Sequence, residues 1–414
     1  MLGVKVWRRV LGVDRATVIE AVEVDEDVIV AHVRPRRDSK RRCGKCGIRA
    51  PGYDQGEGRR RWRCIDLGTV RCFLEADSPR VACPEHGPTV VQVPWARHGA
   101  GHTYDFDDLV AWLVTHTAKS TLCELFRIAW PTVGSIVDRV VADARAAHDP
   151  FEGLRRIGID EISYKKGHRY LLVVVDHDTG KLIHAAVRAN KATLQAFFDL
   201  VGDERCKKIS LISADAAPWI AEVVAERCHN ATLCIDAFHV VKWATDALDE
   251  VRRDVWRTAR RAGMIDFASE LKGARYALWK NPEDLTARQE AKLNWIATTN
   301  SPLYRAYLLK EQLRAIIAVK GRRGLKMLHA WLGWAARSRL PAFVKVGRSI
   351  RTNRDGIEAA LMNNLSNALV ESTNTKIRVL HRMAFGFKKP EHLIALALLD
   401  RGGYCPPLPG RQVA

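Results

Sequence analysis

Four residues near the start of the chain have the types and the spacing of a zinc site. In CGKCG two residues separate Cys43 from Cys46, and in CPEHG two residues separate Cys83 from His86. A C-x2-C knuckle lets two thiolates approach one ion, and three sulfurs with one imidazole complete a closed tetrahedral zinc site. The sequence therefore predicts a structural Zn²⁺ held by Cys43, Cys46, Cys83 and His86.

Two further cysteines leave an alternative open. Cys64 and Cys72 could be the true partners of the first knuckle, or they could be buried thiols that bind no metal. Seven residues separate these two cysteines, so they form no knuckle. We favour the first ligand set for that reason.

The same part of the chain is strongly basic. Between Arg34 and Arg63 there are 12 Lys or Arg and only 3 acids, interleaved with Gly, Pro, Tyr53 and Trp62. This composition indicates a small module with little helix that contacts phosphates. The residues that we single out for DNA contact form one run, Arg59, Arg60 and Arg61.

Composition over the whole chain points to the same class of partner. Lys and Arg number 66 against 47 acids, a formal net charge of +19, which favours a polyanion. No apolar run reaches the roughly 18 residues of a membrane span, and MLGVKVWRRVLGV is too short in its apolar part for a signal peptide. Ten cysteines without the dense spacing of a secreted scaffold indicate thiols and metal ligation. We therefore expect a cytoplasmic protein.

Three acids stand out in this basic chain because each closes an apolar segment. RIGID, RYLLVVVD and LIHAAV have strand character, and KKISLISAD and TLCIDAFH follow after helical segments. Three adjacent strands and then strands alternating with helices describe an α/β fold, a mixed sheet covered by helices, in the order expected of a ribonuclease H-like core. In this interpretation Asp160 closes the first strand, Asp215 the fourth and Asp236 the fifth.

Between the basic module and this sheet, the pattern is helical. FDDLVAWLVTH, STLCELFRIA and PTVGSIVDRVVADARA are apolar-periodic, and Pro131 suits the first turn of the third helix. A helix-turn-helix would have its second helix end near Ala129 and its third helix in a DNA groove, exposing Thr132, Ser135 and Arg139. A plain three-helix bundle has the same periodicity and stays open as an alternative.

Strand patterns disappear for more than a hundred residues after His239. The helical segments that follow carry Trp243, Trp256, Trp279 and Trp295, for which core packing is the plainer role. Trp256 with its neighbour Arg257 is the candidate for DNA contact, because arginines flank the tryptophan and an aromatic ring can stack on a displaced base.

A polar helix is predicted near the C-terminus, over SNALVESTNTKIRVLHR. Asn367, Glu371, Asn374 and Arg378 follow one another at offsets of four, three and four, which places them on one helix face. Glu371 is therefore expected among polar neighbours on a half-buried helix.

With these segments the chain resembles the transposases of bacterial insertion sequences in the ISL3 family, members of the DDE class. The resemblance rests on GIDEISYKKGHRY, DAFHVVK, LWKNPEDLT and NALVESTNTKIRVLHRMAFGF and spans nearly the whole chain. It includes a zinc-binding amino-terminal module whose knuckles would be CGKCG and CPEHG. The family's module usually ends in a cysteine pair, and this chain has His86 in the last place.

The resemblance implies cut-and-join chemistry at transposon ends. Its catalytic residues would be Asp160, Asp215 and Glu371, whose carboxylates would hold two Mg²⁺ or Mn²⁺ ions. Two such ions activate the attacking water or 3′-hydroxyl and stabilise the leaving oxygen of a phosphoryl displacement. The catalytic core would be interrupted by an all-helical insertion between the second acid and the glutamate.

Asp215 is the expected second acid, because in this core the second acid follows the fourth strand. Asp236 ends the next strand and belongs to D-x2-H with His239. Asp236 as the ligand stays an alternative. The residues expected to support the site are Asp236, His239, Asn367, Asn374 and Arg378.

Five regions follow from these patterns. We expect a zinc-binding basic module over 1–100, a helix-turn-helix domain over 101–150, the first part of the ribonuclease H-like core over 151–239, the helical insertion over 240–350, and the C-terminal helices of the core over 351–414.

The predicted function is a DNA transposase that binds the terminal inverted repeats of an insertion sequence and performs metal-dependent cleavage and strand transfer. Its partners would be double-stranded DNA at transposon ends and targets and further copies of the chain, as a homodimer or higher oligomer, in the bacterial cytoplasm at the nucleoid. An inactive or domesticated DNA-binding regulator would explain charge, zinc and helix-turn-helix but has no need of three separated acids. A structure-specific nuclease on the same core is a further alternative, and it would cleave without joining.

Overall fold

The computed structural model describes residues 3–37 and 41–411, which form two compact units. Unit 1 consists of residues 1–150 and 377–414, and unit 2 of residues 151–376. The helix α16 (Ala368–Met383) crosses the boundary between them. Within the described residues, no helix has both the length and the apolar character that a membrane span needs.

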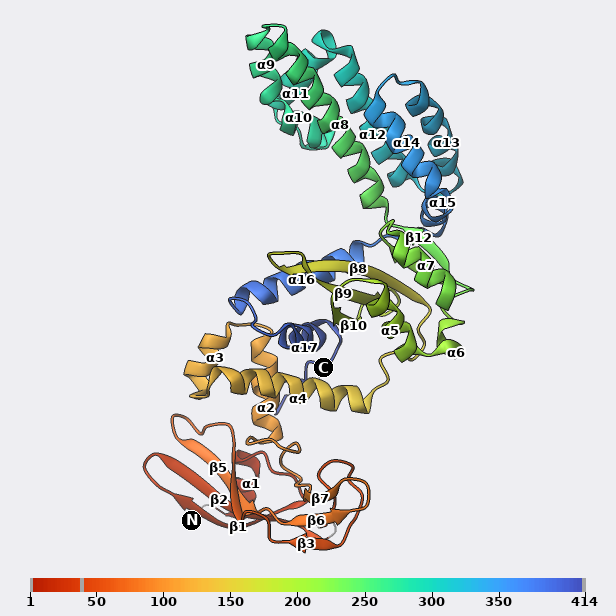
Figure 1. The fold of residues 1–414 in the computed structure, drawn as a ribbon. Coiled ribbons are helices and arrows are strands. Elements are labelled where there is room, and N and C mark those ends of the chain that lie inside the picture. The colour runs from red at the N-terminus through yellow and green to blue at the C-terminus, as the bar shows by residue number, and fades with distance from the viewer. Residues whose placement is uncertain (1–2, 38–40, 412–414) are drawn as a thin grey trace. The chain divides into compact units, whose positions relative to one another are not determined.

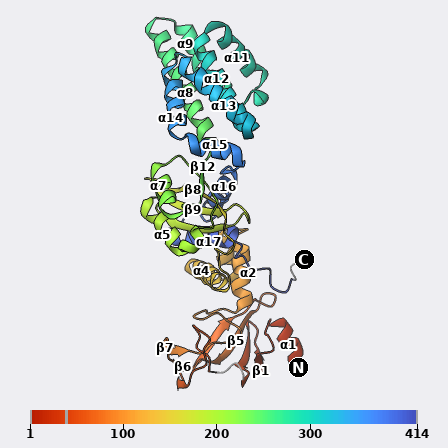
Figure 2. The same ribbon diagram turned by 90° about the vertical axis from the view of Figure 1, so that its right-hand side faces the viewer.

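Unit 1 begins with two small sheets, which Figure 2 shows next to each other. The larger has the strand order β1-β2-β5-β4, in which only β2 and β5 run parallel, and the smaller has the order β3-β6-β7. Trp62 and Leu74 are buried between the larger sheet and the segment around Trp95. The elements are α1 (Val4–Val10), β1 (Thr17–Val24), β2 (Val28–Pro35), β3 (Gly52–Asp54), β4 (Arg59–Arg63), β5 (Arg71–Asp77), β6 (Arg80–Cys83) and β7 (Gly87–Val90).

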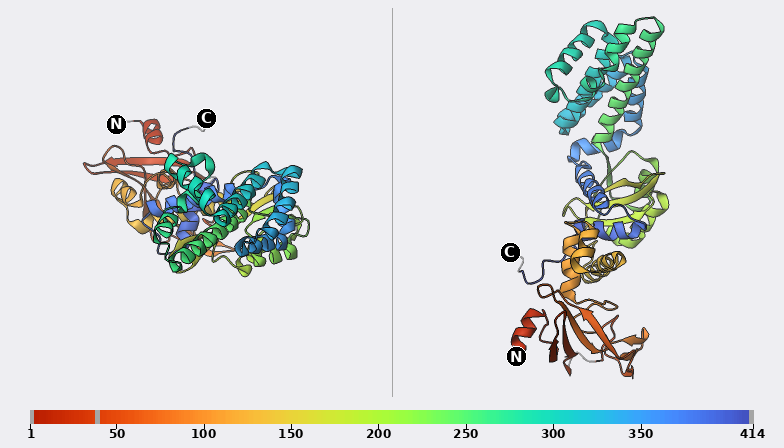
Figure 3. Two further views of the ribbon diagram at one scale, coloured as in Figure 1. Left: turned by 90° about the horizontal axis from the view of Figure 1, so that it is seen from above. Right: turned by 90° about the vertical axis from the view of Figure 1, so that its left-hand side faces the viewer.

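Helices make up the rest of unit 1. Three of them, α2 (Tyr104–Val114), α3 (Lys119–Phe126) and α4 (Trp130–Ala147), adjoin the strands, as the orange to gold helices in the right-hand view of Figure 3 show. The C-terminal helix α17 (Pro390–Arg401) packs on α4. We expected the second of the three helices to end near Ala129, and it ends three residues earlier. The reason is that Arg127 takes a left-handed conformation, with φ 53°, which stops the helix.

Unit 2 contains a five-stranded sheet with the order β10-β9-β8-β11-β12. The first three strands along the chain form an antiparallel meander, and β11 and β12 add to β8 in parallel. The central strands are apolar because helices cover them, and Phe197 and Phe198 of α5 are fully buried there. The elements are β8 (Arg156–Lys165), β9 (Arg169–Asp176), β10 (Leu182–Val187), α5 (Lys191–Val201), α6 (Asp203–Cys206), β11 (Leu211–Ala214), α7 (Pro218–Arg227) and β12 (Thr232–Ile235).

The prediction that Asp160 closes the first strand is wrong. Strand β8 continues to Lys165, because Ile162 is buried and the antiparallel pairing with β9 persists to the hairpin turn. Asp215 and Asp236 do follow the ends of β11 and β12, as predicted. Asp160 therefore lies in mid-strand, beyond the short stretch that pairs with β11.

A block of helices follows β12 directly (Figure 1). Its core includes the fully buried Trp331, and Trp243, Trp256, Trp279 and Trp295 are partly buried against that core. Gly356 lets α15 approach β12, since a Cβ there would lie 2.8 Å from Ile235. The helices are α8 (Ala237–Arg261), α9 (Ile265–Lys272), α10 (Arg275–Trp279), α11 (Ala287–Thr299), α12 (Ser301–Val319), α13 (Gly321–Arg337), α14 (Pro341–Thr352) and α15 (Arg354–Asn363), with a short 3₁₀ turn at Pro282–Asp284.

Candidate active site and zinc centre

The register of the sheet in unit 2 brings three aspartates to one level. In the parallel pairing of β8 with β11, Ser213 lies opposite Gly158. Asp215 and Asp160 each lie two residues further along their chain segments, so they are level with each other. In the pairing of β11 with β12, Ala214 lies opposite Ile235, so Asp215 is level with Asp236 as well. Parallel strands in register place their successive residues side by side. The three carboxylates therefore belong to one edge of the parallel part of the sheet.

An imidazole links two of these carboxylates. Nδ1 of His239, in the first turn of α8, lies 2.8 Å from Oδ1 of Asp215 and 3.0 Å from Oδ2 of Asp236. The contacts with the Asp215 and then the Asp236 carboxylate raise the pKa of His239 to about 10. Asp215, Asp236 and His239 each have one atom that could bind a metal ion, and these three atoms lie within 4.8 Å of one another.

The Asp160 carboxylate is held from α16. Nδ2 of Asn374 donates to Oδ2 of Asp160 at 2.7 Å. Burial raises the pKa of Asp160 to about 6, and the negative charge of Asp215 adds to this, although the backbone N–H of Glu161 opposes it. The surroundings of Asp160 therefore disfavour its negative charge, and a bound hard cation such as Mg²⁺ would stabilise that charge.

Asn367, just before α16, ties the neighbouring strands to that helix. Its Nδ2 donates to the carbonyl of Ile159 at 3.2 Å, and its backbone N–H donates to Oδ1 of Asp236 at 3.2 Å. Ser213 donates its hydroxyl to Oδ1 of Asn367 and accepts from Nε2 of His177 at 2.7 Å. Asn367 and Ser213 are both buried. These bonds fix the spacing between β8, β11 and the start of α16.

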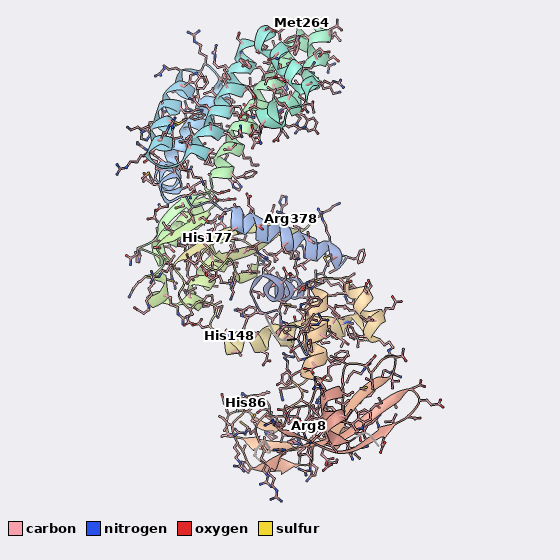
Figure 4. All side chains as sticks on the ribbon, turned by 180° about the vertical axis from the view of Figure 1, so that it is seen from behind. Arg8, His86, His148, His177, Met264 and Arg378 are labelled. Atoms are coloured by element: carbon pink, nitrogen blue, oxygen red, sulfur yellow. The ribbon has the colours of Figure 1, made fainter. Side chains whose placement is uncertain are left out.

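Close approach of α16 to the sheet depends on Gly158. A Cβ at this position would lie 2.3 Å from Cγ2 of Val370 and 2.8 Å from Nε2 of His177. Such contacts are closer than real Cβ atoms show, so a side chain here would push the helix away. Figure 4 labels His177 at the sheet.

Glu371 lies one turn before Asn374 on α16 and is half-buried. Together with Asp236 and Ser366 it lines a cavity of about 520 Å³. Of the four residues predicted to share one face, Asn367 and Asn374 are buried, Glu371 is half-buried, and Arg378 is exposed. Glu371 and Asp236 therefore line the same cavity, and Asn374 contacts Asp160.

In unit 1, the four predicted zinc ligands lie together. Sγ of Cys46 is 3.6 Å from Sγ of Cys83, and Nδ1 of His86 is 3.7 Å from Sγ of Cys83 and 3.9 Å from Sγ of Cys43. Zinc–sulfur bonds of about 2.3 Å at tetrahedral angles put donor atoms roughly 3.7 Å apart, so this set fits Zn²⁺. Figure 4 labels His86 beside the strands of the small sheet.

Cys64 and Cys72 lie elsewhere. Both are buried in the core of the larger sheet, where the N–H of Cys64 donates to the carbonyl of Cys72 at 2.8 Å. Burial raises the pKa of both thiols. They behave as small apolar side chains, which was the alternative we left open for them.

Comparison with known proteins finds three family models that match successive parts of the chain. A family model for the ISL3 DDE group, described as a transposase, matches residues 157–397. The chain belongs to the ISL3 family of transposases. A helix-turn-helix domain of that transposase family matches residues 91–141, and a zinc-finger domain of the transposases of IS204, IS1001, IS1096 and IS1165 matches residues 39–86.

Curated relatives of this ISL3-family member extend the similarity over its length. A transposase for insertion sequence element IS1557 from Mycobacterium tuberculosis (strain CDC 1551 / Oshkosh) is 56% identical over 437 aligned residues, covering 100% of this chain and 98% of the relative. The IS1557 transposase of strain ATCC 25618 / H37Rv gives the same values. The transposase for IS1001 from Bordetella parapertussis is 24% identical over 358 residues, covering 84% of this chain and 86% of the relative.

The residues predicted for DNA contact in this transposase have varied surroundings. Ser135 is exposed, Thr132 is half-buried, and Arg139 faces the buried Asp107 at 3.3 Å. Arg59 and Arg61 reach Glu75, and the third arginine of that run, Arg60, lies over the ring of Trp62 and donates to a backbone carbonyl. Arg257 is exposed and pairs with Asp254. DNA contact by these residues stays a prediction.

Sequence reasoning missed Ser213, His177 and Gly158. Each lies within an apolar strand or its following turn, where no spacing rule marks it as part of a site. Ser213 carried one signal, a hydroxyl in the otherwise apolar run before Asp215. A buried hydroxyl in a strand has to find a partner, which here is Asn367.

Proposed function

We propose that this ISL3-family transposase binds the terminal inverted repeats of its insertion sequence, cleaves DNA there and joins the ends to a target. Asp160, Asp215 and Glu371 would be the catalytic residues and would hold Mg²⁺ or Mn²⁺. The observation that carries this is the register of β8, β11 and β12, which brings Asp160, Asp215 and Asp236 to one edge of the sheet, while Glu371 of α16 lines a cavity together with Asp236. A strand order β10-β9-β8-β11-β12 supports a ribonuclease H-like core.

The residues of the chain would divide the work as follows. Asp160, Asp215 and Glu371 would bind the two ions, which when present activate the attacking oxygen and stabilise the leaving oxygen. Asn374 would orient the Asp160 carboxylate, because its amide donates to one of the carboxylate oxygens. His239 would reduce the repulsion between the Asp215 and Asp236 carboxylates, since its protonated ring contacts both of them.

Asp215 stays our choice for the second acid. Its side chain is 26% exposed, whereas that of Asp236 is 2% exposed and accepts from the backbone of Asn367. A metal-bound carboxylate has to reach the substrate phosphate, which the more exposed residue does more readily. Asp236, with His239, Asn367, Asn374 and Arg378, would support the site.

The remaining assignments follow from the family and from charge. The cluster of Cys43, Cys46, Cys83 and His86 would bind one structural Zn²⁺. We keep the five regions set out above, with the module over 1–100 and the helices over 101–150 contacting DNA. We further propose a homodimer or higher oligomer on transposon-end and target DNA, working in the cytoplasm at the nucleoid.

The test is a reaction with the protein's own end DNA. The full chain would be incubated with Mg²⁺, a labelled duplex carrying one end of the element and a target plasmid, and the products separated by size. We expect a cut at the element boundary and labelled strands joined to the plasmid, both abolished by Glu371→Gln without loss of a gel shift. Cutting without joining would indicate a nuclease, and a gel shift with neither product would indicate a regulator.

A further inference from the structure

The cavity beside Glu371 lies between the sheet and the helical block of unit 2. Its wall begins at the end of β12 and the first turn of α8, passes the junction of α12 with α13, and returns through α15 to the start of α16. Asp236 and Glu371 lie on it, and Ser366 and Asn281 add polar groups. Most of the remaining wall is apolar, contributed by Ile235, Phe238, Ile317, Ile357, Leu361 and Leu365.

Phe238 is the unusual residue of this wall. It follows Asp236 by two residues and directly precedes His239, yet its side chain is 59% exposed. Its ring and the His239 ring are nearly perpendicular, with centroids 6.0 Å apart, so the His239 ring does not stack on Phe238. An aromatic ring exposed to this extent contributes little hydrophobic free energy to folding, and a ligand in the cavity would gain that free energy by covering the ring.

Another residue that lines the cavity, Lys320, has a strained backbone. Lys320, between α12 and α13, has φ 56° and ψ −178°, a conformation that is essentially restricted to glycine. Its amine reaches Oδ1 of Asn364, which is itself left-handed. Arg322 and Arg323 follow and are exposed. Strain held in place at a cavity wall is typical of functional sites, and the charges here suit a phosphate backbone.

We propose that this cavity takes an unpaired nucleobase of the DNA next to the cleaved phosphate, stacked on Phe238. The proposal rests on the proposed function and adds a specific contact to it. Glu371, one of the proposed catalytic residues, and Asp236 line the cavity, so a base in it would lie near the reacting phosphate. An aromatic face with apolar walls and a few polar groups suits a flat base, and bases drawn out of a duplex are bound by such stacking.

Trp256, which we predicted for a stacking role, is placed differently. It is half-buried against the core of the helical block, and the Arg260 guanidinium lies 5.2 Å from its ring centroid. Its ring is therefore largely occupied by the protein itself. Among the described residues of α8, Phe238 combines an exposed ring with a position beside the acids.

The experiment combines a protein change with a DNA change. The cleavage rate of wild type and of Phe238→Ala would be measured on the intact end duplex, and on duplexes with a single abasic site at each position flanking the cut. On intact DNA we expect Phe238→Ala to cleave roughly 5- to 150-fold more slowly, the effect of one lost base stack. At one abasic position, where no base is left to bind, the two proteins should agree within about two-fold.

Tyr276→Ala is the matched control. Tyr276 is 63% exposed on α10, at the end of the helical block away from β12 (Figure 1), and its variant should follow wild type on every duplex. Phe238→Trp should keep the wild-type rate and Phe238→Leu should not, because leucine keeps apolar bulk but has no ring face. Thermal melting of all variants near the wild-type temperature checks the fold.

Three results would overturn the inference. These are an unchanged rate for Phe238→Ala on intact DNA, the same loss on intact DNA and at every abasic position, or full rescue by Phe238→Leu. Cleavage of intact DNA by wild type tests the proposed function separately. If wild type does not cleave, the proposed function fails and this inference fails with it.

Discussion

The predicted zinc site of unit 1 and the proposed catalytic acids of unit 2 are both groups of candidate metal ligands, but they are built in different ways. The zinc ligands come from two knuckles in which two residues separate each pair, and they form a closed set of sulfur and nitrogen donors. The acids come from β8, β11 and α16, with more than two hundred residues between Asp160 and Glu371. Spacing along the chain defines the first site, and sheet register defines the second.

This difference has an energetic side. A closed zinc site supplies folding free energy to the small sheet around it, whose buried core of Cys43, Ala50, Val81 and Cys83 includes two of the predicted ligands. The acids of unit 2 cost stability when no cation is bound, since burial raises the pKa of Asp160, and Asp215 and Asp236 both face the His239 ring. Losing the metal should unfold the first site and leave the second folded but inactive.

The largest effect is expected at the zinc centre. Cys43→Ser should remove the one zinc bound per chain and the fold of the amino-terminal module, because structural zinc contributes about 10 kcal/mol or more to such folding. Metal analysis and limited proteolysis would measure both losses. Cys64→Ser, which changes a buried thiol of the neighbouring core, should keep its zinc. Zinc retained in the first variant or lost in the second would contradict the assignment.

Asp215→Ala should be next, with cleavage about 1,000-fold slower and end binding nearly unchanged, because it removes a metal ligand rather than a phosphate contact. Asp160→Ala and Glu371→Ala should behave alike. Asp236→Ala should slow cleavage less but lower the melting temperature, since it leaves the buried N–H of Asn367 unpaired at a cost of about 1–3 kcal/mol. A larger catalytic loss for Asp236→Ala would make Asp236 the second acid.

A smaller effect is expected for Asn374→Ala. The variant keeps Asp160 but removes the amide that orients it, and outer-sphere partners of metal ligands typically contribute 10- to 100-fold. The Mg²⁺ concentration for half-maximal cleavage should rise about 10-fold. Asn363→Ala is a control, since that side chain donates only locally to the carbonyl of Ala359 on α15. An unchanged Mg²⁺ dependence in Asn374→Ala would leave Asn374 with a packing role alone.

The smallest expected effect is the pH dependence of stability that arises from His102, a largely buried histidine of unit 1 that is not a predicted metal ligand. Burial, with Arg139 and Arg63 nearby, lowers the pKa of His102 to about 4, from 6.5 in the unfolded chain. Between pH 6.5 and 4 the unfolded state binds the extra proton, so acidification through this range destabilises the fold. His102→Gln should lose this dependence, and its melting temperature should gain on wild type as pH falls.

Asp107 acts in the opposite direction in the same range. Burial raises its pKa to about 6, so its protonation below pH 6 favours the folded state. Because Nδ1 of His102 lies 3.6 Å from Oδ1 of Asp107, the difference between the two proteins reports this pair of residues. A difference in melting temperature that stays constant between pH 7 and pH 4.5 would mean that His102 does not titrate as described.

Much of this chain could be predicted from local pattern. Spacing, periodicity and composition over short stretches of sequence predict the knuckles, the three helices before the sheet, the five strands of unit 2 and the long helical block. Local errors arose where one backbone conformation decides the outcome. The left-handed Arg127 ends α3 early, and the buried Ile162 carries β8 past Asp160.

The sequence by itself determined which residues have the chemistry: cysteines and a histidine for zinc, and acids and amides for an active site. Only the tertiary structure decided which of them meet. The register of β8, β11 and β12 aligned the aspartates, Gly158 let α16 approach, and the helical block left Phe238 exposed beside the acids. The physical reason is that pattern along a chain reports contacts over a few residues, whereas pairing register and helix packing depend on partners far away in sequence.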